Sequence, residues 1–291
     1  MDIRNVQRTG NMHYVYLPTS WCKKYGIKST SKIMLDTNND GSLLISPVMR
    51  KKELKEIDIS IDEKDEHIIT MLIMACYLNP TKSFRIRLSQ ELDIAKLLDK
   101  KNAISGFEFV EFDGHSITYE SSMSINDPES LLKTMVKKIR NLITIMVDDY
   151  NHSLVNKYEE EIDRSKLLID KAVTEVLMLN EQTKLKPIEL HYISLISQHL
   201  ERMVDFLIKL EKKNKTFLKE ILSIIDEMNN IVLNLSTLDF KDIVALIKKV
   251  LALKQEGMNN VEQYNRSITG GNLMNVSEIF LDWSITKEID K

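Results

Sequence analysis

The chain has 291 residues, of which 43% are hydrophobic and 29% charged, and its formal net charge is −3. These fractions are typical of a soluble globular protein with two or three domains. Its longest apolar stretches, such as residues 68–78, are too short to span a bilayer. Its first residues are charged and polar, so we expect no signal peptide. Cys22 and Cys76 are far apart, so we expect reduced thiols in a cytoplasmic protein and no zinc site.

The charge is distributed unevenly along the chain. Residues 1–52 contain nine Lys or Arg and three acidic residues, a net charge of +6, which leaves −9 for the remainder. A small basic module joined to an acidic body favours binding of a polyanion, although a solvated lysine-rich face gives the same count. Dimerisation would double the positive patch and would therefore favour binding of a polyanion over a merely solvated face.

The first elements are predicted within residues 1–52. Residues 4–18 alternate apolar and polar side chains and turn at Gly10-Asn11. A short helix and a second strand pair follow, which turns at Asp40-Gly41 and ends at Ile45. So small a unit cannot bury a sufficient core alone. We therefore expect two copies to interleave and to present a basic two-fold surface.

This opening resembles the AbrB-type swapped-hairpin DNA-binding domains, in the form that begins many archaeal phosphate-uptake regulators. The resemblance covers about forty residues and departs from the family pattern at Met12 and at Thr30-Ser31. The matching residues are Arg4, Val6, Gln7, Gly10, Val15, Leu17, Pro18, Trp21, Gly26, Ile27, Ile33 and the run 41–45.

The candidate DNA-binding residues are basic or polar and lie in this module. Those expected to contact phosphates are Arg4, Arg8, Lys23 and Lys24. Those that would read base edges from the first hairpin are Asn5, Gln7 and Asn11. We interpret Tyr16 and Trp21 as core residues rather than base-stacking ones.

Residues 53–122 are predicted to form a middle α/β domain without a catalytic constellation. We expect it to be a spacer or a second dimer contact. The predicted elements are a strand over 54–61, a helix over 63–78 capped by Asp62, a strand over 83–88, a helix from Ser89 to about 101, and a hairpin of 107–112 and 116–119 around Asp113-Gly114.

Residues 123–291 are predicted to be almost wholly helical. Asp127-Pro128 is a strong start signal for the first helix, which runs to about Asp149. A second helix contains residues 155–176, Lys186-Pro187 opens a third, and three more cover roughly 215–235, 239–265 and 273–289. The motif of residues 200–206 recurs at 277–283, so the six helices form two three-helix repeats of a bundle.

The repeated motif resembles the Glu-x-x-x-Asp motifs of the PhoU family, which is built as paired three-helix bundles. Glu159 and Asp163 share one helical face, as do Glu201 and Asp205, and antiparallel packing would bring the four together. Four oxygen ligands suit a hard cation such as Mg, Mn, Ca or Fe, and the family is known for metal clusters at such motifs.

Two observations limit the metal prediction. Arg164 and Arg202 would neutralise the carboxylates by salt bridges alone, without any metal. In the second repeat the positions of Glu159 and Asp163 are occupied by Lys249 and Leu253, so we expect no cluster at Glu278 and Asp282. His199 is interpreted as a packing residue, because its spacing puts it on another face.

The resemblances imply a homodimeric transcriptional regulator of phosphate uptake. The alternative is a PhoU-type adaptor that contacts a phosphate-transporter ATPase or a sensor kinase, with the N-terminal domain only dimerising. The sequence contains no Gly-rich nucleotide motif, no nucleophile elbow and no His-Glu-x-x-His pattern. We therefore predict that the protein is not an enzyme, binds no organic cofactor and does not insert into a membrane.

Overall fold

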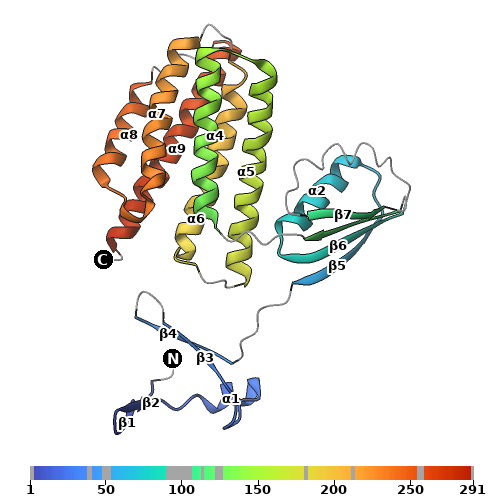
Figure 1. The fold of residues 1–291 in the computed structure, drawn as a ribbon, viewed down its shortest axis with the longest axis vertical. Coiled ribbons are helices and arrows are strands. Elements are labelled where there is room, and N and C mark those ends of the chain that lie inside the picture. Colours follow the sequence, from blue (N-terminus) through green and yellow to red (C-terminus); the bar gives the residue numbers. More distant parts are fainter. Residues whose placement is uncertain are drawn as a thin grey trace. The chain divides into compact units, whose positions relative to one another are not determined.

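The computed structural model describes residues 3–37, 41–47, 54–89, 107–112, 115–121, 127–179, 183–210, 214–253 and 259–289. The chain separates into two compact units, Met1–Glu53 and Leu54–Lys291 (Figure 1). Small β-strands characterise the first unit, and the second is rich in α-helix. Within the described ranges, no helix combines the length and apolar character needed to cross a membrane.

The N-terminal unit consists of two hairpins and one short helix. Strands β1 (Gln7–Thr9) and β2 (Met12–Tyr14) pair antiparallel about Gly10, whose φ of 62° needs a glycine. Helix α1 (Thr19–Tyr25) ends at Gly26 in the left-handed conformation. Strands β3 (Met34–Thr37) and β4 (Leu43–Ser46) form the second hairpin, as predicted, although Asp40 of its turn lies outside the described residues.

No described side chain of this N-terminal unit is buried. The two hairpins form separate two-stranded sheets and share no ladder of backbone hydrogen bonds. Eight large apolar side chains are between 48% and 89% exposed: Ile3, Val6, Met12, Val15, Tyr16, Leu35, Leu43 and Leu44. A single copy therefore leaves its apolar surface in water, and Tyr16 is not part of a core in it.

The second unit begins with a four-stranded sheet in the order β5-β6-β8-β7. Its strands are β5 (Lys55–Ile61), β6 (Thr81–Leu88), β7 (Phe107–Phe112) and β8 (Ser116–Ser121). Strands β5 and β6 are parallel, joined through helix α2 (Glu66–Leu78), and the other pairs are antiparallel. One face packs on α2, and the core between them contains Ile69 and Tyr77 of α2 with Phe84, Ile86 and Tyr119 of the sheet.

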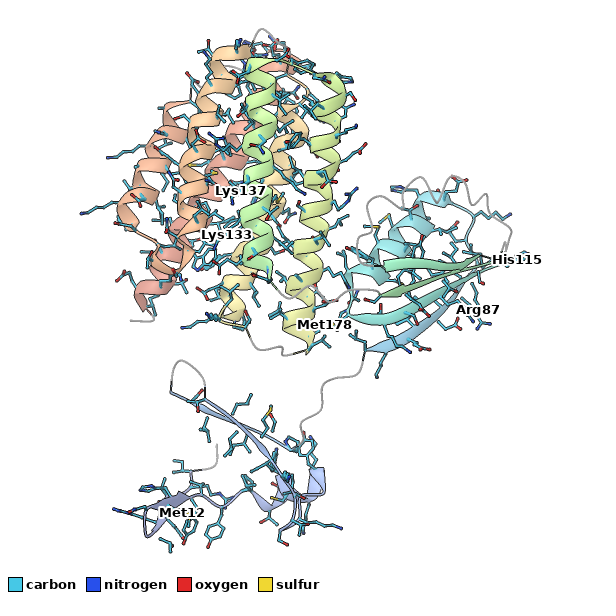
Figure 2. All side chains as sticks on the ribbon, viewed as in Figure 1. Met12, Arg87, His115, Lys133, Lys137 and Met178 are labelled. Carbon is cyan, nitrogen blue, oxygen red and sulfur yellow. The ribbon has the colours of Figure 1, made fainter. Side chains whose placement is uncertain are left out.

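The opposite face of the sheet is charged. Arg85 and Arg87 are exposed on β6 (Arg87 is labelled in Figure 2), and Arg87 donates two hydrogen bonds to Asp58 on β5. Apolar and charged residues alternate along β6 because successive strand residues point to opposite faces. The strand predictions for 54–61, 83–88 and the hairpin of 107–119 are confirmed, while the turn at Asp113-Gly114 lies outside the described residues.

The predicted start of helix α2 was wrong by three residues. The cap is Asp65, whose Oδ1 accepts hydrogen bonds from the backbone N–H groups of His67 and Ile68. Asp62 instead accepts a hydrogen bond from the hydroxyl of Ser89, at the end of β6. The helix predicted from Ser89 to about residue 101 lies outside the described residues beyond Ser89.

Six α-helices follow in the described part of the unit. They are α4 (Pro128–Asp148), α5 (His152–Leu179), α6 (Pro187–Leu207), α7 (Lys215–Leu233), α8 (Phe240–Ala252) and α9 (Val261–Ile289). Each packs on its neighbour in the chain within the groups α4–α6 and α7–α9, and the groups meet where α4 packs on α7 and α6 on α9 (Figure 1). A continuous apolar core runs between the helices.

The last two helices differ from the prediction. Helix α8 ends at Ala252, and α9 begins at Val261 because Asn260 accepts a hydrogen bond from the Gln263 N–H. Helix α9 continues through Gly270-Gly271, where the sequence predicted a break. A helical glycine costs about 1 kcal/mol relative to alanine, and buried Thr269 and Leu273 on either side anchor the helix in the core.

Candidate functional site

Helices α5 and α6 carry the predicted carboxylates and are held antiparallel by polar contacts. Ser194 on α6 donates a hydrogen bond of 3.0 Å to Asp170 on α5, and Lys166 forms an ion pair of 2.8 Å with the same carboxylate. Residues 163 and 201 lie seven positions from this contact on their helices, in opposite directions along antiparallel axes. This register brings the Asp163 segment beside the Glu201 segment.

Helix α6 is also anchored on α9. Glu189 in the first turn of α6 accepts hydrogen bonds from the Lys186 N–H and from Trp283 Nε1, and it pairs with Lys287 at 3.2 Å. One helical turn later, the hydroxyls of Tyr192 and Thr286 lie 2.9 Å apart. These contacts with α9 hold α6 in place independently of its contacts with α5. The orientation of α6 is therefore fixed by both neighbouring helices.

The structure brings three of the four predicted ligands together. One carboxylate oxygen from each of Glu159, Asp163 and Asp205 lies within 4.8 Å of the other two. Two oxygens on opposite sides of one cation are about 4–5 Å apart, so this separation fits a single hard ion. Glu201 adds no oxygen to this group but lies close enough for its charge to raise the pKa of Asp163.

Burial raises the pKa values of all four carboxyl groups, and repulsion by neighbouring carboxylates contributes for Glu159, Asp163 and Glu201. Burial raises the pKa of Asp163 to about 7, and the charges of Glu159, Glu201 and Asp205 contribute. Burial is also the main cause that raises the pKa values of Glu159, Glu201 and Asp205. Four carboxylates of this kind are costly together unless protons or a cation neutralise them.

The salt bridges that would have explained the cluster without a metal are not formed within the described residues. Arg164 pairs with Glu161, which also pairs with Lys138 at 2.9 Å. Arg202 is exposed and only lowers the pKa values of Glu201 and Asp205 through its charge. None of the four cluster carboxylates makes a hydrogen bond or ion pair with another described residue.

The donor set therefore fits a hard cation. It consists of carboxylate oxygens with no cysteine, which suits Mg, Mn, Ca or Fe. Lys166 and Lys209 lower the pKa values of cluster carboxyls, and the sequence analysis did not identify either of them. For Lys166, the available signal in the sequence was its four-residue spacing from Asp170, which places both side chains on one helical face.

The second repeat contains no equivalent cluster among its described residues. Glu278 and Asp282 are exposed on α9, Lys249 pairs with Glu227, and Leu253 is buried. His199 lies 3.0 Å from Asn272 Oδ1 on α9, so it belongs to the α6–α9 packing as interpreted.

The candidate DNA-binding residues are all exposed in the N-terminal unit, namely Arg4, Asn5, Gln7, Arg8, Asn11, Lys23 and Lys24. They do not share one face of a single copy. Gln7 and Arg8 are neighbours on β1 and so point to opposite sides of the hairpin. Arg8 lies opposite His13 on β2, which the sequence analysis did not select.

The two lysines lie in the last turn of α1. Lys23 and Lys24 are favourably placed beside the negative end of the helix dipole. Trp21 is half-buried on the same helix against Tyr25, with ring centroids 5.5 Å apart. This contact favours a packing role for Trp21 over base stacking.

No protein family, curated protein or solved structure matches this chain.

Proposed function

We propose that the protein is a dimeric DNA-binding transcriptional regulator of phosphate uptake, with an AbrB-like head and a PhoU-like helical domain. The observation that carries the proposal is the N-terminal unit, in which no described residue is buried. A chain of this size needs a second copy to cover its apolar side chains. The same unit has the basic charge balance that attracts a nucleic-acid backbone.

The proposed mechanism links the two parts through conformation. Metal or partner occupancy at the bundle shifts its conformation and thereby the orientation of two DNA-binding heads. Such a regulator works in the cytoplasm, where its promoters are.

The DNA test uses the full chain and labelled duplexes from promoters of phosphate-transport genes. Fluorescence anisotropy should give binding at 50 mM salt that falls about 10³-fold or more by 200 mM, because phosphate contacts release counterions. Arg8→Ala should weaken DNA binding, whereas Lys248→Ala, which removes an exposed lysine on α8, should not. Absence of any binding at 50 mM salt would reject the proposal.

We further propose that Glu159, Asp163 and Asp205 hold one hard cation, with Glu201 beside them. Their half-buried and mutually repelling carboxylates support this. Metal analysis of the purified protein should find a cation that is lost when the four residues are changed to alanine. The matched control is Glu278→Ala with Asp282→Ala in the other repeat, which should keep the metal. Equal metal content in all three proteins would reject the site.

An adaptor role is the second candidate function. Leu177 at the end of α5 and Ile188 at the start of α6 are 45% and 40% exposed at one end of the bundle. Exposed apolar side chains there favour docking of a partner helix. The adaptor is supported if the full chain captures a phosphate-transporter ATPase or a sensor kinase and ignores promoter DNA.

A further inference from the structure

A polar groove of about 560 Å³ lies between α4 and α7, away from the α5–α6 carboxylates. Its volume is within the roughly 300–1,000 Å³ of small-molecule sites, but its lining is hydrophilic where such sites are usually apolar. Lys137 of this groove is labelled in Figure 2. The lining residues are Lys137, Arg140 and Asn141 on α4, with Asp226, Asn229 and Asn230 on α7.

The cations of the groove retain donor capacity. Arg140 Nε donates to Asp226 Oδ1 at 2.5 Å, which orients the guanidinium, and its terminal nitrogens make no hydrogen bond to a described residue. Lys137 makes no ion pair with any residue that the structure describes. An arginine fork beside a lysine is the arrangement that suits the oxygens of a tetrahedral anion.

Asp226 places an acceptor in the same groove. Its Oδ1 accepts the hydrogen bond from Arg140 Nε, and no described residue donates to its Oδ2. An occupant that offers an O–H group can donate to this carboxylate, whereas a fully deprotonated anion is repelled by it.

These features select the chemistry of the occupant. Two cations call for an anion, but Asp226 places an acceptor in the same groove. Sulfate has no proton at neutral pH and would be repelled by Asp226. Inorganic phosphate keeps a proton, so it can accept from Lys137 and Arg140 and donate to Asp226. A phosphate monoester meets the same need only through a hydroxyl of its organic part.

We propose that the α4–α7 groove binds a phosphate group that also donates a hydrogen bond, either free phosphate or a hydroxyl-bearing phosphate ester. Binding itself follows from the groove, but its role as the signal that the regulator reads rests on the function proposed above. Helix α4 connects the groove to α5, because Lys138, beside Lys137, donates to the Glu161 side chain and to Ser165.

The test is isothermal titration calorimetry of the full chain at constant ionic strength. Sodium phosphate, glycerol 3-phosphate and sodium sulfate are titrated separately, which distinguishes free phosphate from an ester. We expect saturable binding of phosphate or the ester and at least about tenfold weaker binding of sulfate, the effect of one charged hydrogen bond.

Four variants sharpen the test. Lys137→Met and Arg140→Met should each weaken binding about tenfold or more, while Lys248→Met, an exposed lysine on α8, should not change it. Asp226→Asn should reduce the preference for phosphate over sulfate, because the amide no longer repels sulfate. Lys137 has no described partner to lose, so its variant remains informative if Arg140→Met disturbs folding.

Three results would overturn the site: no saturable heat with either phosphate compound, equal affinity for sulfate, or equal weakening by Lys137→Met and Lys248→Met. The site and the proposed function fail separately. Promoter binding without phosphate binding rejects the groove alone. Phosphate binding without promoter binding keeps the groove and rejects the regulator.

Discussion

Trp21 in the N-terminal unit and Trp283 in the bundle are the two tryptophans of the chain, and their surroundings differ. Trp283 is fully buried and donates a hydrogen bond to Glu189, with Tyr192 packed beside it. Trp21 is half-buried on a seven-residue helix that has no buried residue. The bundle covers its apolar residues within one chain, and the N-terminal unit does not.

This difference predicts where a second copy would be needed. The helical bundle has a core of its own, so its folding does not require a partner. The N-terminal unit has the size and exposure of half a domain, and its folding should depend on protein concentration. The following changes test that contrast, beginning with the largest expected effect.

Leu35→Asp should have the largest effect on the molecule, because it should abolish the dimer altogether. Leu35 is 59% exposed on β3, and a charge there would be buried if two heads interleave. We expect a monomer in analytical ultracentrifugation and a loss of DNA affinity of about 30-fold or more, as for an interface hot spot. The matched control is Leu251→Asp, because Leu251 is 64% exposed on α8. Equal effects of both changes would show that the two regions do not differ.

Trp283→Ala should lower the free energy of unfolding of the bundle by about 3–5 kcal/mol, because a large fully buried side chain leaves a cavity. Denaturant unfolding followed by circular dichroism measures this value. Trp21→Ala should leave the bundle transition unchanged. A loss below about 1 kcal/mol for Trp283→Ala, the range of a surface substitution, would contradict the described core.

Lys171→Met tests a buried charge at the contact of α5 with α2. Lys171 is fully buried, pairs with Glu175 at 2.7 Å and donates to the Tyr77 carbonyl oxygen. Removing it leaves Glu175 buried without its cation, which should cost about 3 kcal/mol in urea unfolding. Combining Lys171→Met with Glu175→Leu should recover most of the loss. No recovery in the double variant would contradict the assigned pairing.

Asp163→Asn should have the smallest effect, seen as a change in pH dependence. Asp163 has a pKa of about 7 in the folded protein and an ordinary value of 3.8. Since the folded state binds the extra proton, metal-free protein should lose stability as pH rises through this window. The variant should reduce the difference between pH 5 and pH 8 by about 2 kcal/mol, allowing for solvent screening.

Thermal unfolding of chelator-treated protein at both pH values measures this slope. Glu278→Gln is the control, because Glu278 is exposed on α9, outside the cluster, and its removal should keep the slope. An unchanged slope in Asp163→Asn would mean that Asp163 is not the group that titrates.

The sequence alone predicted the strands, most helix positions and the proximity of three carboxylates. Local signals sufficed for these: the alternation along β6, the Asp127-Pro128 start of α4, and the four-residue spacing of Glu159 and Asp163. They failed at α2 and α9. Two aspartates compete to cap α2, and Gly270-Gly271 stays helical because the flanking residues Thr269 and Leu273 are buried in the core.

Only the tertiary structure decided how these elements work together. The register between Asp170 and Ser194 determines which carboxylates meet, and periodicity within one helix cannot fix it. The groove between α4 and α7 and the Lys171 contact with α2 arise from residues far apart in the chain. Helical spacing determines which side chains share a face, but packing between helices determines which faces meet.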